Sequence, residues 1–117
     1  MPTLREFVRS LQRRAGIDAA VVAGRDGLLI DGAGASALDA ETLAVRVPQL
    51  LASIRDLGTA AARGHVQMAV IEYSGGTAVI QALSAEVVLL VLVHSTGNLA
   101  ALLHDLRRFR PHLTAIA

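Results

Sequence analysis

Residues 87–93 read Val-Val-Leu-Leu-Val-Leu-Val, and this run decides the fold class of the chain. It follows the turn-like Ser84-Ala85-Glu86 and is rich in β-branched valine, which favours a strand. The run is far shorter than the roughly twenty residues that a membrane-crossing helix needs. A strand that is apolar at every position has both of its faces covered. We therefore expect it in the middle of a sheet with helices on both sides, which is a three-layer α+β domain.

Four further strands are predicted upstream of this run. Residues 65–73 and 77–83 are apolar stretches that are joined by the turn residues Ser74-Gly75-Gly76. Residues 17–24 and 28–30 are separated by Arg25-Asp26-Gly27. Asp-Gly is among the strongest hairpin signals because both positions tolerate a positive φ. Residues 17–24 and 28–30 therefore form a hairpin. Residues 65–73, 77–83 and 87–93 form a meander.

The first and third of three predicted helices are recognised by their caps. Thr3 and Glu6 match a capping box, so the first helix is expected over roughly residues 3–15, with a stop at Gly16. The third helix is expected to end at Pro111, because proline does not continue a helix. Its candidate caps are Ser95, Thr96 and Asn98.

The second helix is predicted to be the longest, from a cap at Ser36 or Asp39 to about residue 63. Pro48 lies inside it and is expected to kink it, because proline removes one backbone hydrogen bond. An apolar seam repeats along it at alternating steps of four and three residues: Leu43, Val47, Leu50, Ile54, Leu57 and Ala61. A polar row runs beside the seam with similar stepping: Thr42, Arg46, Gln49, Ser53 and Asp56.

The seam and the row predict two different contacts. We interpret the seam as a surface that packs on another helix or on a sheet. The row lies about 100° away around the helix, so it stays accessible when the seam is buried. Arg46, Arg55 and Arg63 are candidates for contact with an acidic or phosphate-bearing partner. The alternative for these arginines is a helix face that meets only solvent.

The composition indicates one domain, residues 1–117, that associates with other copies of itself. Hydrophobic residues make up 53% of the chain and the mean hydropathy is +0.51, which is more apolar surface than one small core hides. The net charge is only +1, the arginines are scattered, and the only aromatic residues are Phe7, Tyr73 and Phe109. A nucleic-acid-binding role is therefore not expected.

The sequence favours a cytoplasmic location. The absence of cysteine fits a reducing compartment. Residues 1–14 mix apolar side chains with arginines and lack the apolar core of a secretory signal. No run is long enough to insert into a membrane. The absence of lysine indicates a GC-rich bacterial genome.

No group of residues predicts an active site, a cofactor or a metal ion. Gly32-x-Gly34 resembles the start of a dinucleotide-binding turn, but position 37 is alanine where the third glycine is needed, and the preceding strand sits in a hairpin. His94, Ser95 and Asp105 are the residue types of a nucleophilic triad, but Ser95 is better explained as a helix cap. The histidines lack metal-ligand spacing; they are His65, His94, His104 and His112. We therefore predict a protein that is not an enzyme and has no cofactor.

One known family combines these features at this spacing. The first helix leads into Ala15-Gly16-Ile17, and the Ala-rich second helix and Val70-Ile71-Glu72-Tyr73 follow the hairpin. The other matching stretches are residues 19–23, 26–30, 89–93 and 97–99. In these stretches, over nearly all of its length, the chain resembles the Roadblock family, which includes dynein light chains and bacterial MglB-type proteins. The resemblance implies a profilin-like antiparallel sheet in the order 2-1-5-4-3, with the second helix on one face and the first and third helices on the other.

The resemblance also implies a homodimer in which strand three forms an edge that pairs with its copy, while the second helices pack together. An uncovered apolar edge strand promotes association, and residues 65–71 carry no proline or inward charge to prevent it. The expected dimer interface comprises Leu43, Val47, Leu50, Ile54, His65, Val66, Gln67, Met68 and Ala69.

The partner that the resemblance implies is a small Ras-like GTPase, which the dimer would bind and regulate. The residues expected to contact it are Arg46, Gln49, Ser53, Arg55 and Asp56. The alternative is a dimeric scaffold for signalling or motility proteins that has no effect on nucleotide hydrolysis.

Overall fold

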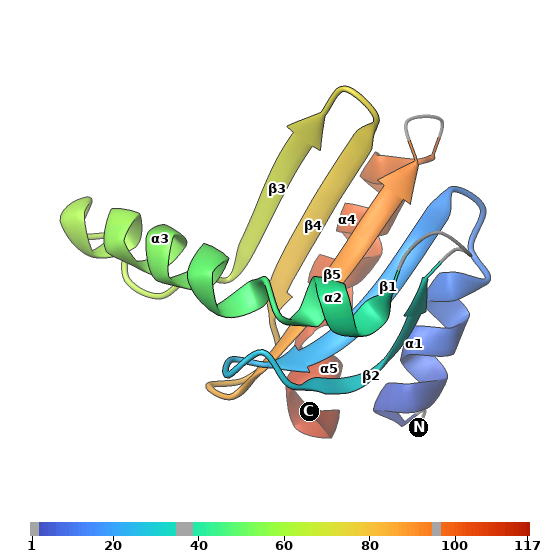
Figure 1. Ribbon diagram of the computed structural model, residues 1–117, viewed down its shortest axis with the longest axis horizontal. Coiled ribbons are helices and arrows are strands. Elements are labelled where there is room, and N and C mark those ends of the chain that lie inside the picture. The colour runs from blue at the N-terminus through green and yellow to red at the C-terminus, as the bar shows by residue number, and fades with distance from the viewer. Residues whose placement is uncertain (1–2, 35–38, 95–96) are drawn as a thin grey trace.

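The strand β5 (Val87–His94) lies at the centre of a five-stranded antiparallel sheet in the computed structural model, which describes residues 3–34, 39–94 and 97–117 (Figure 1). The other strands are β1 (Ile17–Gly24), β2 (Leu29–Gly34), β3 (Met68–Tyr73) and β4 (Gly76–Ala82). Their order across the sheet is β2-β1-β5-β4-β3. The predicted order is therefore confirmed, and β2 and β3 form the two edges.

The apolar run of β5 is buried on both faces, as its composition predicts. Val91 pairs with Ala20 of β1 on one side and with Val79 of β4 on the other, and all three side chains are buried. Val88 and Leu89, neighbours along the strand, contribute to the cores on opposite faces of the sheet. Each face of β5 is therefore covered by a separate layer.

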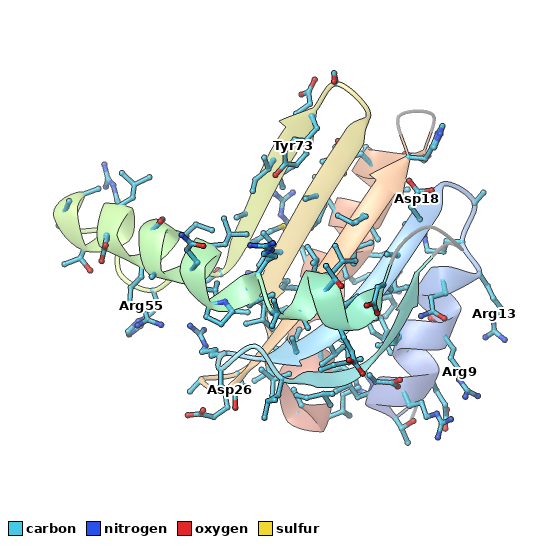
Figure 2. All side chains as sticks on the ribbon, in the orientation of Figure 1. Arg9, Arg13, Asp18, Asp26, Arg55 and Tyr73 are labelled. Carbon is cyan, nitrogen blue, oxygen red and sulfur yellow. The ribbon has the colours of Figure 1, made fainter. Side chains whose placement is uncertain are left out.

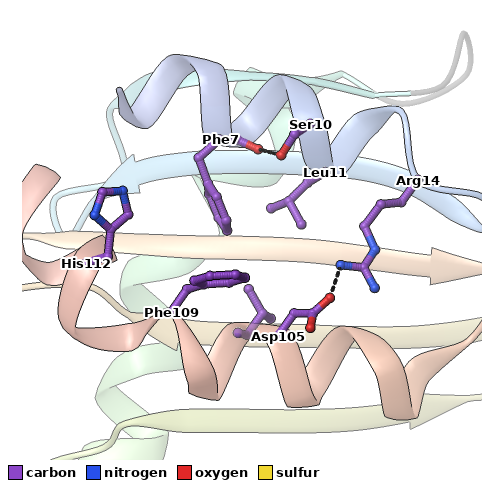
Figure 3. Close-up of a pocket in the computed structure, with 8 residues that line it drawn as sticks. Phe7, Ser10, Leu11, Arg14, Asp105, Phe109 and His112 are labelled. Carbon is purple, nitrogen blue, oxygen red and sulfur yellow. Dashed lines mark hydrogen bonds and ion pairs between the residues drawn. The ribbon is translucent and has the colours of Figure 1, made fainter. Parts of the chain in front are cut away.

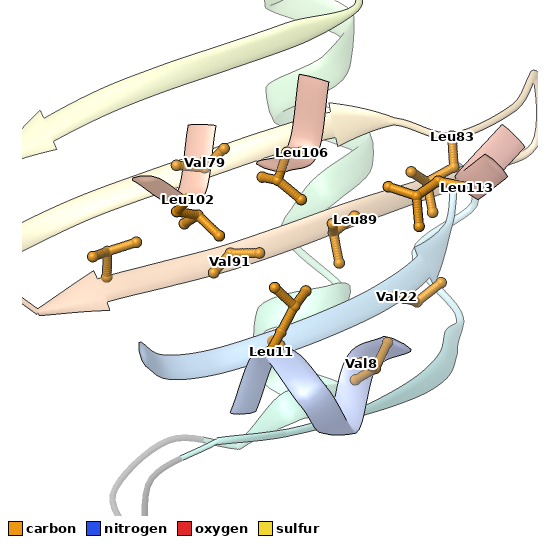
Figure 4. Close-up of a cluster of buried hydrophobic side chains, with 12 residues drawn as sticks. Val8, Leu11, Val22, Val79, Leu83, Leu89, Val91, Leu102, Leu106 and Leu113 are labelled. Carbon is orange, nitrogen blue, oxygen red and sulfur yellow. The ribbon is translucent and has the colours of Figure 1, made fainter. Parts of the chain in front are cut away.

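The described helices form one layer on each face of the sheet (Figure 1). The first layer consists of α1 (Leu4–Gln12), α4 (Leu99–Arg108) and α5 (Arg110–Ile116). Its core joins the three helices to the sheet through Val8, Leu11, Leu102, Leu106 and Leu113 (Figure 4). The second layer consists of α2 (Ala40–Ala44) and α3 (Val47–Ala60), which contribute Ala44, Val47 and Leu51. The predicted three-layer arrangement is confirmed.

Side-chain caps fix the starts of three of these helices. Thr3 Oγ1 accepts a hydrogen bond from the Glu6 N–H at 3.2 Å, as a capping box requires, and α1 ends at Gln12, before the predicted residue 15. Asp39 accepts from the Glu41 N–H at 3.2 Å and begins α2. Asn98 accepts from the Ala101 N–H at 3.1 Å and begins α4. The other candidate caps, Ser36, Ser95 and Thr96, lie outside the described residues.

Both prolines predicted to disturb helices instead begin them. Pro48 lies in the first turn of α3, so the predicted long helix is two helices that meet at Val45 and Arg46. Pro111 likewise lies in the first turn of α5 and does not end the helical part of the chain. In a first turn the missing N–H of proline would have had no partner inside the helix, so the residue is tolerated there.

Two strand boundaries differ from the prediction by more than one residue. The second strand, which was predicted to end at residue 30, continues to Gly34. A Cβ atom on Gly32 would lie only 2.7 Å from the carbonyl oxygen of Ala20 on β1, so a glycine is required by the close approach of the two strands. At the other edge, β3 begins at Met68 rather than at His65.

Candidate protein-interaction surface

The edge strand β3 has one side free for a further strand. Among the described strands β3 pairs only with β4. The Gln67 carbonyl accepts from the Ala82 N–H at 3.0 Å, and hydrogen-bonded pairs alternate along an antiparallel ladder. Met68, Val70 and Glu72 therefore direct their N–H and C=O groups away from β4. Such a row of unpaired backbone groups is a template for pairing with another chain.

Helix α3 runs past this same edge (Figure 1). At its beginning Val47 and Leu51 are only 3% exposed and belong to the core beneath the helix. Further along the helix Ile54 is half-buried, and Leu57 is 71% exposed. The apolar seam is thus covered by the sheet of its own chain at one end and is uncovered at the other.

The residues predicted for a dimer interface fall into two groups. Val47 was assigned wrongly, because its side chain is packed inside the core of its own chain and cannot contact a second chain. Leu43 and Leu50 are half-buried against the same core. The remaining residues lie at or beyond the β3 edge, either half-buried or exposed: Ile54, His65, Val66, Gln67, Met68 and Ala69. The second group is accessible to a partner chain.

The polar row of the second helix is exposed as predicted, but Arg55 does not belong with it. Thr42, Arg46, Gln49, Ser53 and Asp56 are all exposed. Arg55 is nine positions after Arg46, which places it about 180° away around a helix with 3.6 residues per turn. Arg46 lines one hollow together with Tyr73, whereas Arg55 lines another with Arg25 and His65. The structure therefore separates the two arginines by the width of the helix.

An apolar groove beside Arg46 was not predicted from the sequence. Its volume is about 410 Å³, and Leu43 and Leu50 on the helices and Ile71 on β3 contribute to its walls. Tyr73 stands 61% exposed at its end, where β3 turns into β4 (Figure 2). The sequence signal that could have indicated this groove is the lone tyrosine just before the Ser-Gly-Gly turn. Aromatic residues are enriched at protein interfaces.

A second apolar hollow lies on the opposite face, between α1 and α4 (Figure 3). Both phenylalanines of the chain, Phe7 and Phe109, face each other across it, and its volume is about 550 Å³. The Arg14 guanidinium and the Asp105 carboxylate form an ion pair of 2.7 Å at one end, and His112 lies at the other. This ion pair joins the turn after α1 to α4 and occupies the Asp105 carboxylate.

The structure describes most, but not all, of the residues that the sequence offered for catalysis or metal binding. Asp105 faces Arg14, and Ser95 lies outside the described residues. In the part of the chain that the structure describes, no three His, Asp or Glu side chains are close enough to hold a metal ion. Gly32 and Gly34 lie in β2, where strand packing accounts for the first of them. None of the described helices is long and apolar enough to cross a membrane.

The sheet order, with helices on both faces, agrees with a family match. Residues 3–93 match the model of the Roadblock/LC7 domain. The chain belongs to the Roadblock/LC7 family. Roadblock/LC7 domains are in general small regulatory or adaptor domains. None of the curated proteins matches the sequence.

Three solved structures show that the Roadblock fold extends over nearly the whole chain. MglB of Myxococcus xanthus has a TM-score of 0.81 and 19% identity, with 92% of this chain and 81% of that chain covered. A Roadblock/LC7 domain from Streptomyces avermitilis has a TM-score of 0.77 and 23% identity, with 96% and 98% covered. An MglB described as having a tetrameric arrangement has a TM-score of 0.82 and 19% identity, with 96% and 85% covered. At these identities the likeness shows the fold.

Proposed function

We propose that this Roadblock/LC7 protein is a non-catalytic homodimeric adaptor, in which the β3 edges of two chains pair and the α3 helices pack across them. The observation that carries the proposal is the free edge of β3, beyond which the uncovered end of α3 projects. A second sheet added at β3 would lie under the exposed part of the seam. One association would therefore satisfy the unpaired backbone groups and bury Leu57 together.

Two-fold symmetry fits both parts of this surface. In a two-fold dimer the same patch is used on each chain, so β3 pairs antiparallel with its copy and each seam meets the other. The result would be one continuous ten-stranded sheet with the α3 helices on one face. The tetrameric arrangement named for a structurally similar MglB supports self-association as a property of this fold.

The partner that we propose is a small Ras-like GTPase, which docks on the polar row. Membership of the Roadblock/LC7 family and the MglB-like fold support this choice of partner. Arg46 lies next to the apolar groove that ends at Tyr73, so a charged contact and an aromatic contact stand side by side. Arginine and tyrosine are favoured at protein interfaces for these two properties. The docking surface comprises Arg46, Gln49, Ser53, Asp56 and Tyr73.

A scaffold without effect on hydrolysis is the second candidate function. The hollow between Phe7 and Phe109 favours it, because it lies on the face of the sheet opposite α3. A dimer with contact surfaces on both faces can hold two different proteins at once. A GTPase regulator needs only the α3 face.

The test combines binding with nucleotide turnover. The purified protein is mixed with a Ras-like GTPase from the same genome, and both the affinity and single-turnover GTP hydrolysis are measured. Specific binding that Arg46→Glu weakens at least about tenfold, equivalent to about 1.4 kcal/mol, supports the proposed surface. Binding without a change in hydrolysis selects the scaffold function. No binding in the GDP-bound or GTP-bound state of the GTPase contradicts the proposed partner.

The mode of regulation is tested by Arg46→Ala. Loss of an arginine that enters the active site of a GTPase reduces hydrolysis roughly 10³–10⁵-fold. We expect Arg46→Ala to reduce stimulated hydrolysis far less, because the proposed adaptor acts by repositioning the partner's own residues. If Arg46→Ala reduces stimulated hydrolysis roughly 10³-fold or more while binding is retained, Arg46 has a catalytic role.

A further inference from the structure

Three basic side chains from separate parts of the chain line one hollow at the end of the sheet. Arg25 comes from the turn between β1 and β2, Arg55 from α3, and His65 from the segment that precedes β3. The hollow has a volume of about 570 Å³, which is in the size range of small-molecule sites. The rest of its lining is small or apolar: Val66, Ala82, Leu83, Ser84 and Ala85.

Arg25 is held in place with one donor unused. Its backbone N–H donates to the Glu86 carbonyl at 3.0 Å, and its Nη2 lies 3.5 Å from the Ser84 carbonyl. Its Nε atom is buried and has no hydrogen-bond partner among the described residues. The contacts with Glu86 and Ser84 hold the Arg25 guanidinium group at the wall of the hollow.

Among the described residues, no ion pair neutralises the positive charge of this cluster. In residues 3–34, 39–94 and 97–117, no carboxylate lies within ion-pair distance of Arg25 or Arg55. Asp26, the nearest acid along the chain to Arg25, uses Oδ1 to accept from the Leu28 N–H at 3.0 Å. Two unpaired guanidinium groups that line one concave site form a favourable place for an anion.

We propose that Arg25, Arg55 and His65 form a binding site for a phosphate monoester. The planar guanidinium group presents paired N–H donors that match the oxygens of a phosphate, and two of them are present here. The apolar floor formed by Ala82, Leu83 and Val66 would receive the organic part of the ester. The same chemistry is offered by a phosphorylated side chain of a partner protein and by a free organic phosphate.

The site is independent of the GTPase proposal but borders the proposed dimer interface. His65 and Val66 line the hollow and also lie among the residues expected to meet a second chain. Phosphate binding can therefore be tested whether or not a GTPase binds. The mass in solution is measured for every variant, so that loss of the dimer is distinguished from loss of the site.

The experiment is an NMR titration of the full ¹⁵N-labelled chain with three probes: inorganic phosphate, phenyl phosphate and the peptide Ala-Ala-phosphoserine-Ala-Ala. We expect saturable shifts of the backbone amides of Arg25, Val66, Ser84 and Ala85. The two esters should bind more tightly than inorganic phosphate, because only they contact the apolar floor. Tighter binding of the peptide identifies a protein source of the phosphate, and tighter binding of phenyl phosphate identifies a small molecule.

Matched variants separate a built site from general attraction to positive charge. Arg25→Gln and Arg55→Gln should each weaken phenyl phosphate binding about tenfold, which corresponds to about 1.4 kcal/mol. Arg63→Gln removes the same charge from the segment that follows α3 and should leave the affinity unchanged, because Arg63 does not line this hollow. Arg55 is exposed, so its variant does not disturb the fold. The proposal is overturned if no probe gives saturable shifts, if inorganic phosphate binds as tightly as the esters, or if Arg63→Gln weakens binding as much as Arg55→Gln.

Discussion

Leu57→Ala is expected to weaken the proposed homodimer strongly while leaving the fold of each chain unchanged. Leu57 is 71% exposed on the separate chain, so it contributes little to the chain's own core. Alanine also favours a helix at least as well as leucine, so α3 stays intact. Full burial of a leucine side chain contributes about 2 kcal/mol. Since most of this side chain is available to the interface, we expect a loss of about 1.5 kcal/mol per chain on the same scale.

In the proposed two-fold dimer both copies of Leu57 lie in the interface, so the expected loss is about 3 kcal/mol for the dimer and the dissociation constant should rise roughly 100-fold. Sedimentation velocity over a range of concentrations measures this change. Leu28→Ala is the matched control, because Leu28 is 68% exposed and lies in the turn before β2, at the opposite edge of the sheet. An unchanged dissociation constant for Leu57→Ala, or an equal rise for Leu28→Ala, would refute the placement of the interface at α3.

Three further variants test other contacts. Val70→Pro removes an N–H that points away from β4 and should dissociate the dimer without unfolding the chain. Val70→Thr keeps that N–H and should leave the dimer intact. Light scattering measures the dimer, and circular dichroism measures the fold. Arg46→Glu should weaken partner binding at least about tenfold in calorimetry, and Arg55→Glu should change it much less because it lies on the other side of α3. Asp105→Ala should lower the free energy of unfolding by less than about 1 kcal/mol in a denaturant titration, because its ion pair with Arg14 is partly exposed to solvent.

The strands and the central position of β5 could be predicted because their signals are local, whereas the full strand order was implied by the family resemblance. The continuous apolar run of β5 required cover on both faces, and the Asp26-Gly27 turn required a hairpin. The same local rules were insufficient for Pro48 and Pro111. A proline that ends one helix and a proline that begins the next have similar flanking sequence, and the packing of the flanking segments on the sheet decides between them.

The site was predicted less completely because spacing along a helix does not show where the helix meets the sheet. The seam was recognised, but the sheet covers Val47 and leaves Leu57 free, and this depends on where α3 crosses the β3 edge. Arg55 was grouped with Arg46 from charge alone, although they project from opposite sides of the helix. The convergence of Arg25, Arg55 and His65 joins segments far apart in the sequence, and only the fold reveals it.

The mass of the protein in solution tests the central claim most directly. Multi-angle light scattering at micromolar concentration should give twice the chain mass of 12.2 kDa. A dimer would pair the free backbone groups of the β3 edge and bury the exposed apolar end of α3. The Val70→Pro variant, measured under the same conditions, should give the mass of a single folded chain. A mass of 12.2 kDa for the unaltered protein across the whole micromolar range would contradict the account.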